Sequence, residues 1–350
     1  MRGIRPWSAG SRTGRVIFAS YFDAQRNPFT RGDVSMRLSA IVCTFNRCEV
    51  LRETLRTLDA SQLPPGLDWE VLVVDNNSSD ATRSVCESFV ERNPGRFRYF
   101  FEPRAGKTFA LNTGIANAQG EILAFTDDDV KVDPRWLAEV LRAFETFACA
   151  GIAGRIVPVW NSDKPIWYSS EGPYKLMDAI CRYDFGDEPC VPPVPAYGAN
   201  LSLKRQMLER YGGFRTDLGP TPGKQNPGED AEMCRRLVAA GEKFMYAPRA
   251  IIYHPVEEKR TKKSYFQSWY FEYGCTMVRM GRVDDAPARY LGIPRYMYRM
   301  LAAEFLQWIV ALEPKKRFYH KLQTYQIAGE MAEWRRVRRK QRVEGQAVGA

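Results

Sequence analysis

Short apolar runs alternate with amphipathic segments along the first half of this chain. The apolar runs are rich in Val, Ile, Leu and Phe, as in strands that are buried on both faces. The segments between them repeat their apolar positions at helical spacing. The pattern predicts strands at 38–44, 70–75, 97–101 and 121–126, and helices at about 48–60, 80–92 and 107–118. Such alternation is typical of an α/β fold with a mainly parallel sheet and helices on both faces.

The pattern becomes less regular after a further helix predicted at 134–147. Residues 158–195 hold seven prolines and several aromatic residues, which predicts a long irregular insertion. Residues 219–228 are rich in glycine and proline, the composition of a mobile lid beside a site. Regular structure is expected again at 196–203, in a helix at 229–240 and in a last strand at 243–253.

Three regions follow from these patterns. Residues 1–35 have weak periodicity and carry six arginines against two aspartates, so we expect a disordered or non-native N-terminal extension. Residues 36–255 are expected to form the α/β domain. Residues 256–350 are predicted to form a helical, basic C-terminal region.

The chain carries a formal net charge of +10, from 51 basic and 41 acidic residues. The excess lies at the two ends, so nucleic-acid binding is not predicted. The eight cysteines form no C-x-x-C pair, which favours a reduced setting. The sequence shows neither an apolar run of about 18 residues nor the apolar core of a secretory signal. We therefore expect a cytoplasmic protein, with the inner face of the cell membrane as a further location.

Polar side chains close three of the predicted strands. Thr44, Asp75 and Asp127 each stand at a carboxyl end, where ligands bind in parallel sheets. Asp127 also opens a run of three aspartates. Three adjacent carboxylates repel one another unless a cation neutralises them, which favours Mg²⁺ or Mn²⁺ shared with phosphates. The alternative is an acidic loop that caps the next helix.

Other polar residues lie at the ends of predicted elements. Glu229 and Asp230 begin a helix, whose dipole keeps a carboxylate ionised and able to accept a proton; plain capping is the alternative. His254 ends the last strand and is a candidate metal ligand; the alternative is a purely structural role. Lys107, and with it Arg104, could reach a phosphate near a helix N-terminus; the alternative is an ordinary charged side chain in solvent.

Taken together, these motifs resemble the family 2 glycosyltransferases of the GT-A fold. The similarity covers roughly 36–275, and its five motifs occur in the family's order. They are Ile41-Val-Cys-Thr-Phe-Asn-Arg47, Val73-Val-Asp-Asn-Asn-Ser-Ser-Asp80, Phe125-Thr-Asp-Asp-Asp129, Gly228-Glu-Asp230 and Tyr253-His-Pro255. The resemblance implies a GT-A domain at 36–255, with a nucleotide-binding half at 36–129 and an acceptor half at 130–255.

The resemblance implies a role for each matching residue. Asp230 would be the catalytic base, with Glu229 beside it. The metal, Mn²⁺ or Mg²⁺, would be held by Asp127, Asp129 and His254. The donor would be a sugar linked to UDP, dTDP or GDP. It would contact Thr44, Asn46, Arg47, Asp75, Asn76, Lys107, Asp127 and Asp128. The second loop reads Asp-Asn where many relatives have Asp-Asp, which leaves its nucleotide contacts open.

The implied activity is an inverting transfer of one sugar to an acceptor hydroxyl. The acceptor would be a saccharide or a lipid-linked molecule, in the synthesis of a bacterial cell-surface polysaccharide or glycolipid. The sequence lacks the Q-x-x-R-W motif of processive synthases, which favours a single transfer. Two alternatives stay open. A sugar-phosphate nucleotidyltransferase would carry a Gly-rich, basic loop after the first strand, which 43–47 is not. A non-catalytic protein that binds an anionic ligand would explain the basic tail but not the aspartates.

A last segment favours contact with a membrane surface. Residues 300–312 are apolar except for Glu304 and Gln307 and are flanked by basic residues. A helix of this length spans about 20 Å, too short for a bilayer core of about 30 Å, so it would lie in the interface. We predict peripheral contact of 290–342 with an anionic membrane. The alternative is a helix that packs on the catalytic domain and leaves a solvated basic tail.

Overall fold

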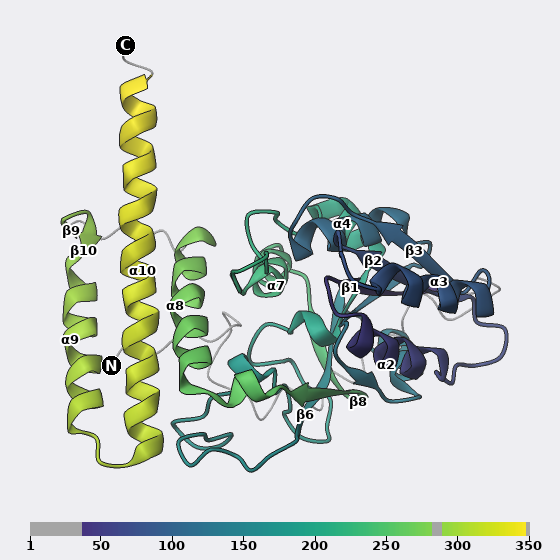
Figure 1. Cartoon of the computed structure of the whole chain (residues 1–350), viewed down its shortest axis with the longest axis horizontal. Helices are drawn as coiled ribbons and strands as arrows, with labels where there is room; N and C mark the ends of the chain where they lie inside the picture. The colour runs from purple at the N-terminus through teal and green to yellow at the C-terminus, as the bar shows by residue number, and fades with distance from the viewer. Residues whose placement is uncertain (1–36, 282–288, 348–350) are drawn as a thin grey trace. The chain divides into compact units, whose positions relative to one another are not determined.

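The computed structural model describes residues 37–281 and 289–347, with side chains as far as residue 337 (Figure 1). The extension predicted at 1–35 lies outside the described residues. The described chain divides into two compact units. The first comprises 37–158, 181–216 and 229–254, and the second comprises 159–180, 217–228 and 255–347.

An eight-stranded sheet organises the first unit. Four strands are parallel, in the order β3-β2-β1-β4, and the α/β class with a parallel sheet is confirmed. Four more strands continue the sheet in the order β7-β6-β8-β5, with antiparallel pairing of β7 to β4 and to β6, and of β5 to β8. The strands are β1 (Leu38–Thr44), β2 (Trp69–Asp75), β3 (Phe97–Phe101), β4 (Ile122–Asp127), β5 (Lys131–Val132), β6 (Gly151–Trp160), β7 (Leu201–Lys204) and β8 (Phe244–Val256).

The helices of the first unit fill the connections between strands. They are α2 (Cys48–Asp59), α3 (Thr82–Arg92), α4 (Lys107–Asn117), α5 (Trp136–Thr146), α6 (Arg205–Tyr211) and α7 (Glu229–Ala239). Helix α4 packs closely on β1 because Gly114 has no side chain: a Cβ there would lie 2.6 Å from the Cγ2 of Ile41. This contact sets Lys107, at the start of α4, over the end of the parallel strands.

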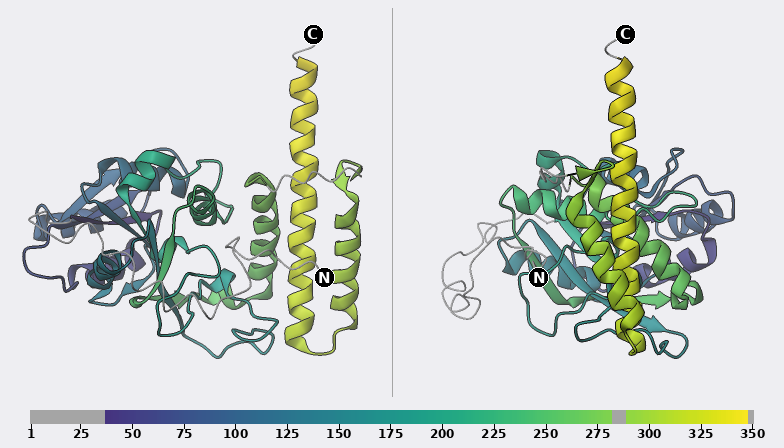
Figure 2. Two further views of the ribbon diagram at one scale, coloured as in Figure 1. Left: turned by 180° about the vertical axis from the view of Figure 1, so that it is seen from behind. Right: turned by 90° about the vertical axis from the view of Figure 1, so that its left-hand side faces the viewer.

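The described residues of the second unit include three long helices, so the predicted helical C-terminal region is confirmed. They are α8 (Lys263–Arg279), α9 (Arg295–Val310) and α10 (Pro314–Ala347). Helix α10 lies between the other two (Figures 1 and 2). Gly274 of α8 and Gly329 of α10 bring these two backbones together, since a Cβ at either would overlap the facing carbonyl. No described helix is both long enough and apolar enough to cross a bilayer.

Residues 217–228 are attached to the helices of the second unit through Asn226. Its backbone N–H donates to Glu272 (2.6 Å), and its side-chain oxygen accepts a hydrogen bond from Arg279 (2.6 Å). Arg279 in turn donates to both carboxylate oxygens of Glu333 on α10, each at 2.9 Å. We call Asn226, Arg279 and Glu333 the Arg279 network. That 219–228 is a mobile lid stays a prediction.

Candidate active site

The ends of the parallel strands bring the predicted polar residues to one edge of the sheet. Thr44 pairs with Asp75 across β1 and β2, and Cys43 pairs with Asp127 across β1 and β4. The register therefore places Asp127 one position from Thr44. The apolar runs before these residues are buried throughout, so the polar ends are fixed by the same packing that forms the sheet.

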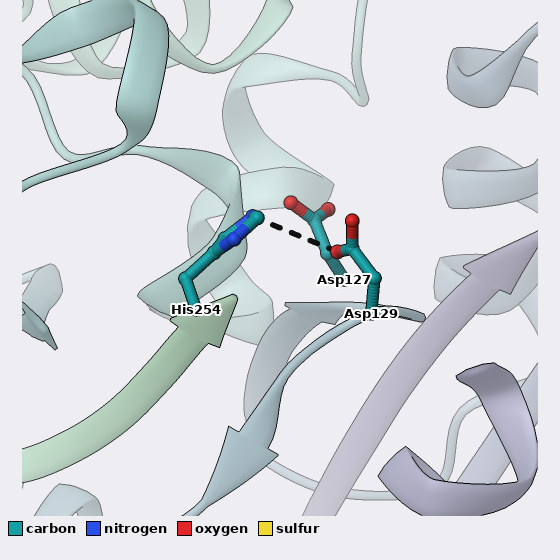
Figure 3. A group of neighbouring side chains, drawn as sticks. All are labelled: Asp127, Asp129 and His254. Carbon is teal, nitrogen blue, oxygen red and sulfur yellow. Dashed lines mark ion pairs between the residues drawn. The ribbon is translucent and has the colours of Figure 1, made fainter. Parts of the chain in front are cut away.

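Two aspartates and a histidine form a compact group at this edge (Figure 3). Asp127, Asp129 and His254 each offer one ligand atom, and these atoms all lie within 4.8 Å of one another. His254, on β8, is fully buried and its Nε2 lies 3.6 Å from an Asp129 oxygen. Two carboxylates and one imidazole make a donor set that suits a divalent cation. The three predicted metal ligands are thus brought together, and we call them the acidic cluster.

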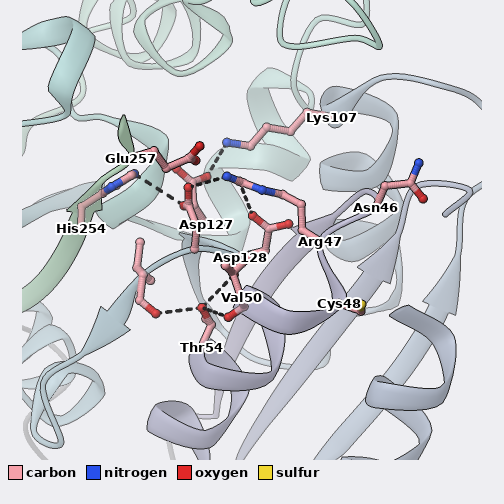
Figure 4. Close-up of polar contacts among 12 residues, drawn as sticks. Asn46, Arg47, Cys48, Val50, Thr54, Lys107, Asp127, Asp128, His254 and Glu257 are labelled. Carbon is pink, nitrogen blue, oxygen red and sulfur yellow. Dashed lines mark hydrogen bonds and ion pairs between the residues drawn. The ribbon is translucent and has the colours of Figure 1, made fainter. Parts of the chain in front are cut away.

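The turn that carries the aspartates is held from below by Thr54 (Figure 4). This buried threonine of α2 places its hydroxyl 2.8 Å from the carbonyl oxygens of both Asp128 and Val130. The hydroxyl can donate to either carbonyl, and it fixes the backbone of 128–130 against α2. The role of Thr54 could not be predicted from the sequence, because nothing in its local pattern distinguishes it from a helix-face residue.

Two cations face the aspartates. Arg47 donates to Asp128 at 2.9 Å and lies 3.0 Å from Asp129, and Lys107 contacts Asp127 at 2.5 Å (Figure 4). Burial raises the pKa of Asp128 to about 6, although Arg47 acts in the opposite direction. Burial lowers the pKa of Lys107, but the carboxylates of Asp127 and Glu229 outweigh it, so the net shift is upward and Lys107 stays charged.

A second acidic pair begins helix α7. Glu229 is buried and Asp230 is half-buried. Burial and the neighbouring Asp230 charge raise the pKa of Glu229 to about 7, and burial also raises the pKa of Asp230. Lys107 lies 3.8 Å from Glu229, so one ammonium group stands between the acidic cluster and this pair.

Backbone amides orient the Asp230 carboxylate. One oxygen accepts a hydrogen bond from the N–H of Gly198 and the other from the N–H of Ala231, both at 2.7 Å. Gly198 is 32 positions away in the sequence, so its part could not be predicted from a local motif. The two bonds hold the carboxylate in one orientation at the start of α7.

The two loops predicted to bind the nucleotide are joined to each other. The side-chain oxygen of Asn46 accepts a hydrogen bond from the N–H of Ser79 (2.7 Å), and the N–H of Asn46 donates to the Ser78 hydroxyl (2.9 Å). Asn46 adopts a positive φ of 51°, a conformation that asparagine tolerates better than most residues. The predicted contacts of Asn46 with a nucleotide remain a prediction.

The other residues of these loops make local contacts. Asp75 accepts hydrogen bonds from the N–H of Ser78 (2.9 Å) and the Tyr99 hydroxyl (3.0 Å). The Asn76 side chain bonds to the backbone of Glu102, Arg104 and Gly106. Asn76 therefore holds the loop that leads to Lys107. The guanidinium of Arg104 donates to the Glu102 carboxylate at 2.8 Å, and its predicted reach to a phosphate stays a prediction.

Comparison with known proteins identifies the family. The family model described as glycosyl transferase family 2 matches residues 39–212, which include both loops, the three aspartates and Gly198. The chain belongs to glycosyl transferase family 2. It is therefore a glycosyltransferase, as the five motifs implied.

This glycosyltransferase has similar relatives among curated proteins. It is 27% identical over 240 residues to the succinoglycan biosynthesis protein ExoM of Rhizobium meliloti, covering 68% of this chain and 73% of that protein. It is 29% identical over 231 residues to a glucosyl-dolichyl phosphate glucuronosyltransferase of Haloferax volcanii, covering 65% and 72%.

Among solved structures, the glycosyltransferase resembles a mannosyltransferase from Pyrobaculum calidifontis, solved in complex with GDP-Man and Mn²⁺. The TM-score is 0.58 at 21% identity, covering 89% of this chain and 90% of the other. This likeness confirms the GT-A fold.

Proposed function

We propose that this glycosyltransferase transfers one sugar from a nucleoside-diphosphate sugar to an acceptor hydroxyl, with inversion at the anomeric carbon and with Mn²⁺ or Mg²⁺ at the acidic cluster. The observation that carries the proposal is the convergence of two groups at one sheet edge: the acidic cluster, and the acidic pair Glu229 and Asp230, with Lys107 between them. Asp127, Asp129 and His254 would hold the metal. A divalent cation there neutralises charge on the leaving diphosphate.

The residues of the chain would divide the remaining work. Asp230 accepts the proton from the attacking hydroxyl, and its two amide hydrogen bonds keep the carboxylate aimed at one position. Lys107 would pair with a phosphate oxygen of the donor. Arg47 would hold Asp128 and Asp129 through its ion pairs with both. A single displacement, with the base and the leaving group on opposite faces of the sugar, inverts the anomeric carbon.

The donor and acceptor classes rest on the relatives. The structural neighbours were solved with GDP-Man and Mn²⁺ and with UDP, GalNAc and Mn²⁺, which supports a GDP- or UDP-linked donor, and the dTDP-linked donor stays a prediction. The relatives' names point to a polysaccharide and to a dolichyl phosphate glycolipid. We propose a saccharide or lipid-linked acceptor in bacterial cell-surface polysaccharide or glycolipid synthesis. No disulfide joins any of the eight cysteines, and the location that we propose is cytoplasmic, as their spacing in the sequence favours.

The test is a panel of UDP-, dTDP- and GDP-sugars, read by release of the nucleoside diphosphate with Mn²⁺, with Mg²⁺ and with a chelator. We expect metal-dependent release from one donor class, and a product whose anomeric configuration, read by NMR, is opposite to the donor's. Release of pyrophosphate from a nucleoside triphosphate and a sugar phosphate would instead indicate a nucleotidyltransferase. Retention of configuration would exclude Asp230 as the base of a single displacement.

A further inference from the structure

Helix α9 of the second unit has one face packed on α10. Met297 is buried with Ile327 and Met331 of α10, and Leu301 packs against the same cluster. One turn further, Glu304 forms an ion pair with His320 of α10 at 2.7 Å. These positions recur at helical spacing, so they define the inner face of α9.

The opposite face of α9 is apolar and exposed. Among the exposed positions of 300–312, only Gln307 is polar. Leu306 is 59% exposed, and Leu312, just beyond the helix, is 97% exposed. We call the following set the outer face of α9: Met300, Phe305, Leu306, Ile309, Val310 and Leu312. A continuous apolar surface of this kind marks an interaction site, because scattered single residues do not produce it.

Positive charge lies at both ends of this outer face. Arg295 and Arg299 are exposed in the first two turns, and Lys315 and Arg317 are exposed just after Leu312. Residues 289–317 contain six basic residues against two acidic ones, a balance of +4. An apolar strip bounded by basic side chains matches a lipid surface, where acyl chains lie beneath anionic headgroups.

We propose that the outer face of α9 docks the enzyme on an anionic membrane surface. Sixteen residues in α9 give a helix of about 24 Å, shorter than a bilayer core of about 30 Å. The helix would therefore lie in the plane of the membrane, with its apolar side chains among the acyl chains and the four exposed basic residues at the headgroups. The inference does not depend on the proposed function, since no residue of the candidate active site belongs to the second unit.

The charges argue against two other occupants. A second copy could pair the same face about a two-fold axis with the two α9 helices antiparallel or parallel. The basic ends of one helix would meet basic ends of the other in both arrangements, so like charges would repel. Residues 1–35 carry six arginines against two aspartates, so their net positive charge would also be repelled by the basic ends of the outer face. An anionic surface is complementary to both ends.

The test is flotation of the full chain with vesicles of pure phosphatidylcholine and with vesicles that also contain phosphatidylglycerol. We expect the protein to float with the anionic vesicles at low salt, and in part at high salt, because apolar insertion is not screened. Binding to the neutral vesicles should be at least about tenfold weaker, since each basic residue adds attraction only to an anionic surface.

Two sets of variants assign the binding to the outer face. Leu306→Ser with Ile309→Ser and Val310→Ser should abolish flotation, while Val191→Ser, an exposed apolar residue of the first unit, should not. Charge reversal at Lys315, Lys316 and Arg317 should weaken anionic binding about tenfold or more. The same reversal at three exposed arginines of the first unit, Arg52, Arg92 and Arg142, is the matched control. All the substituted side chains except Lys316 are exposed, and thermal melting will confirm that each variant is folded.

Several outcomes would overturn the proposal. A wild-type chain that stays in the soluble fraction with both kinds of vesicle does not dock on membranes. Equal flotation of wild type and the α9 triple variant would place the contact elsewhere. Sedimentation that shows a dimer lost in that triple variant, without flotation, would assign the face to a second copy. None of these outcomes would alter the nucleotide-release result, so the two proposals fail separately.

Discussion

The two units of this glycosyltransferase each bury a group of charged side chains, and the two groups are opposite in character. In the Arg279 network, one guanidinium faces one carboxylate and one amide oxygen. Burial raises the pKa of Glu333, but hydrogen bonds from Arg279 more than offset this, so the net shift is downward. The charges are balanced, and the ionised forms of both partners are favoured.

The candidate active site is not balanced in this way. Asp127, Asp128, Asp129, Glu229 and Asp230 supply five carboxylates against the two cations Arg47 and Lys107, which leaves −3 if all are ionised. The pKa values of Asp128, Glu229 and Asp230 are all raised by burial. In a balanced network each charge offsets the burial of its partner, whereas an excess of buried carboxylate favours binding of a cation and uptake of a proton.

The largest expected effect comes from removing a carboxylate of the acidic cluster. Asp129→Ala should lower transfer at least about 10³-fold and abolish Mn²⁺ binding, because a metal ligand is lost. The melting temperature of the metal-free protein should change by only a few degrees, since the repulsion among the aspartates is also relieved. Nucleotide release and calorimetry with Mn²⁺ measure the two effects. The control is Asp163→Ala, an exposed aspartate of the irregular segment; full activity of Asp129→Ala would remove the metal role.

The next effect tests the catalytic pair. Asp230→Asn should lower turnover about 10² to 10⁴-fold, the usual range for a general base, while donor affinity changes little. Glu232→Gln is the matched control, because Glu232 stands in the same helical turn but pairs with Arg236. Turnover and donor binding are measured separately. If Asp230→Asn turns over normally while Glu229→Gln does not, the base is Glu229.

Much of this arrangement could be predicted from the sequence. The strands 38–44 and 97–101 were predicted with the observed bounds, because continuous apolar runs fix buried strands locally. Asp127 could be found because it closes a buried strand, and Glu229 could be found because it begins a helix. Strand β6, from Gly151 to Trp160, was not expected. Pro158 lies within it, and this proline favoured the prediction of an irregular segment.

Contacts between distant residues were beyond the sequence patterns. Gly198 holds Asp230 through its backbone N–H, and a backbone donor leaves no signature in the side-chain sequence. Thr54 supports the turn of the aspartates from α2. Arg47 was expected at the nucleotide, and the structure adds an ion pair with Asp128 and Asp129. Such pairs depend on how the sheet brings separate strand ends together.

A third prediction breaks the balanced network. Arg279→Met should lower the free energy of unfolding by about 3 to 4 kcal/mol, because it leaves the buried Glu333 carboxylate without its guanidinium. Arg279→Met with Glu333→Leu should recover at least half of the loss. Arg336→Met is the control: Arg336 also lies near Glu333, at 3.7 Å, but is 58% exposed, so its loss should cost less than about 1 kcal/mol.

This prediction also tests whether Asn226 holds the glycine- and proline-rich segment 217–228. Limited proteolysis of Arg279→Met should cut there sooner than in wild type, because the hydrogen bond to Asn226 is lost. The variant should keep its turnover per folded molecule, unlike Asp230→Asn. Equal stability of Arg279→Met and Arg336→Met would show that the Arg279 network contributes nothing to folding, and the contrast with the active site would fail.

The smallest effect concerns pH and Glu229. Its folded-state pKa of about 7 lies above the ordinary value of 4.5, so folding favours the protonated carboxyl. The resulting stabilisation is fully present below pH 4.5 and is lost as the pH rises towards 7, by no more than about 3 kcal/mol. Glu229→Gln keeps a neutral side chain at every pH. In the metal-free protein, the stability of wild type relative to this variant should therefore fall between pH 4.5 and 7.

The measurement is urea unfolding of both proteins at pH 4.5, 5.5, 6.5 and 7.5 without divalent cations. Subtracting the unfolding free energy of the variant from that of wild type cancels the contributions of other carboxylates. One of these is Glu102, whose pKa is lowered by Arg104 and whose contribution has the opposite sign at lower pH. A difference that stays constant across the range would mean that the pKa of Glu229 is the same in the folded and unfolded protein, with the Lys107 ammonium compensating for its burial.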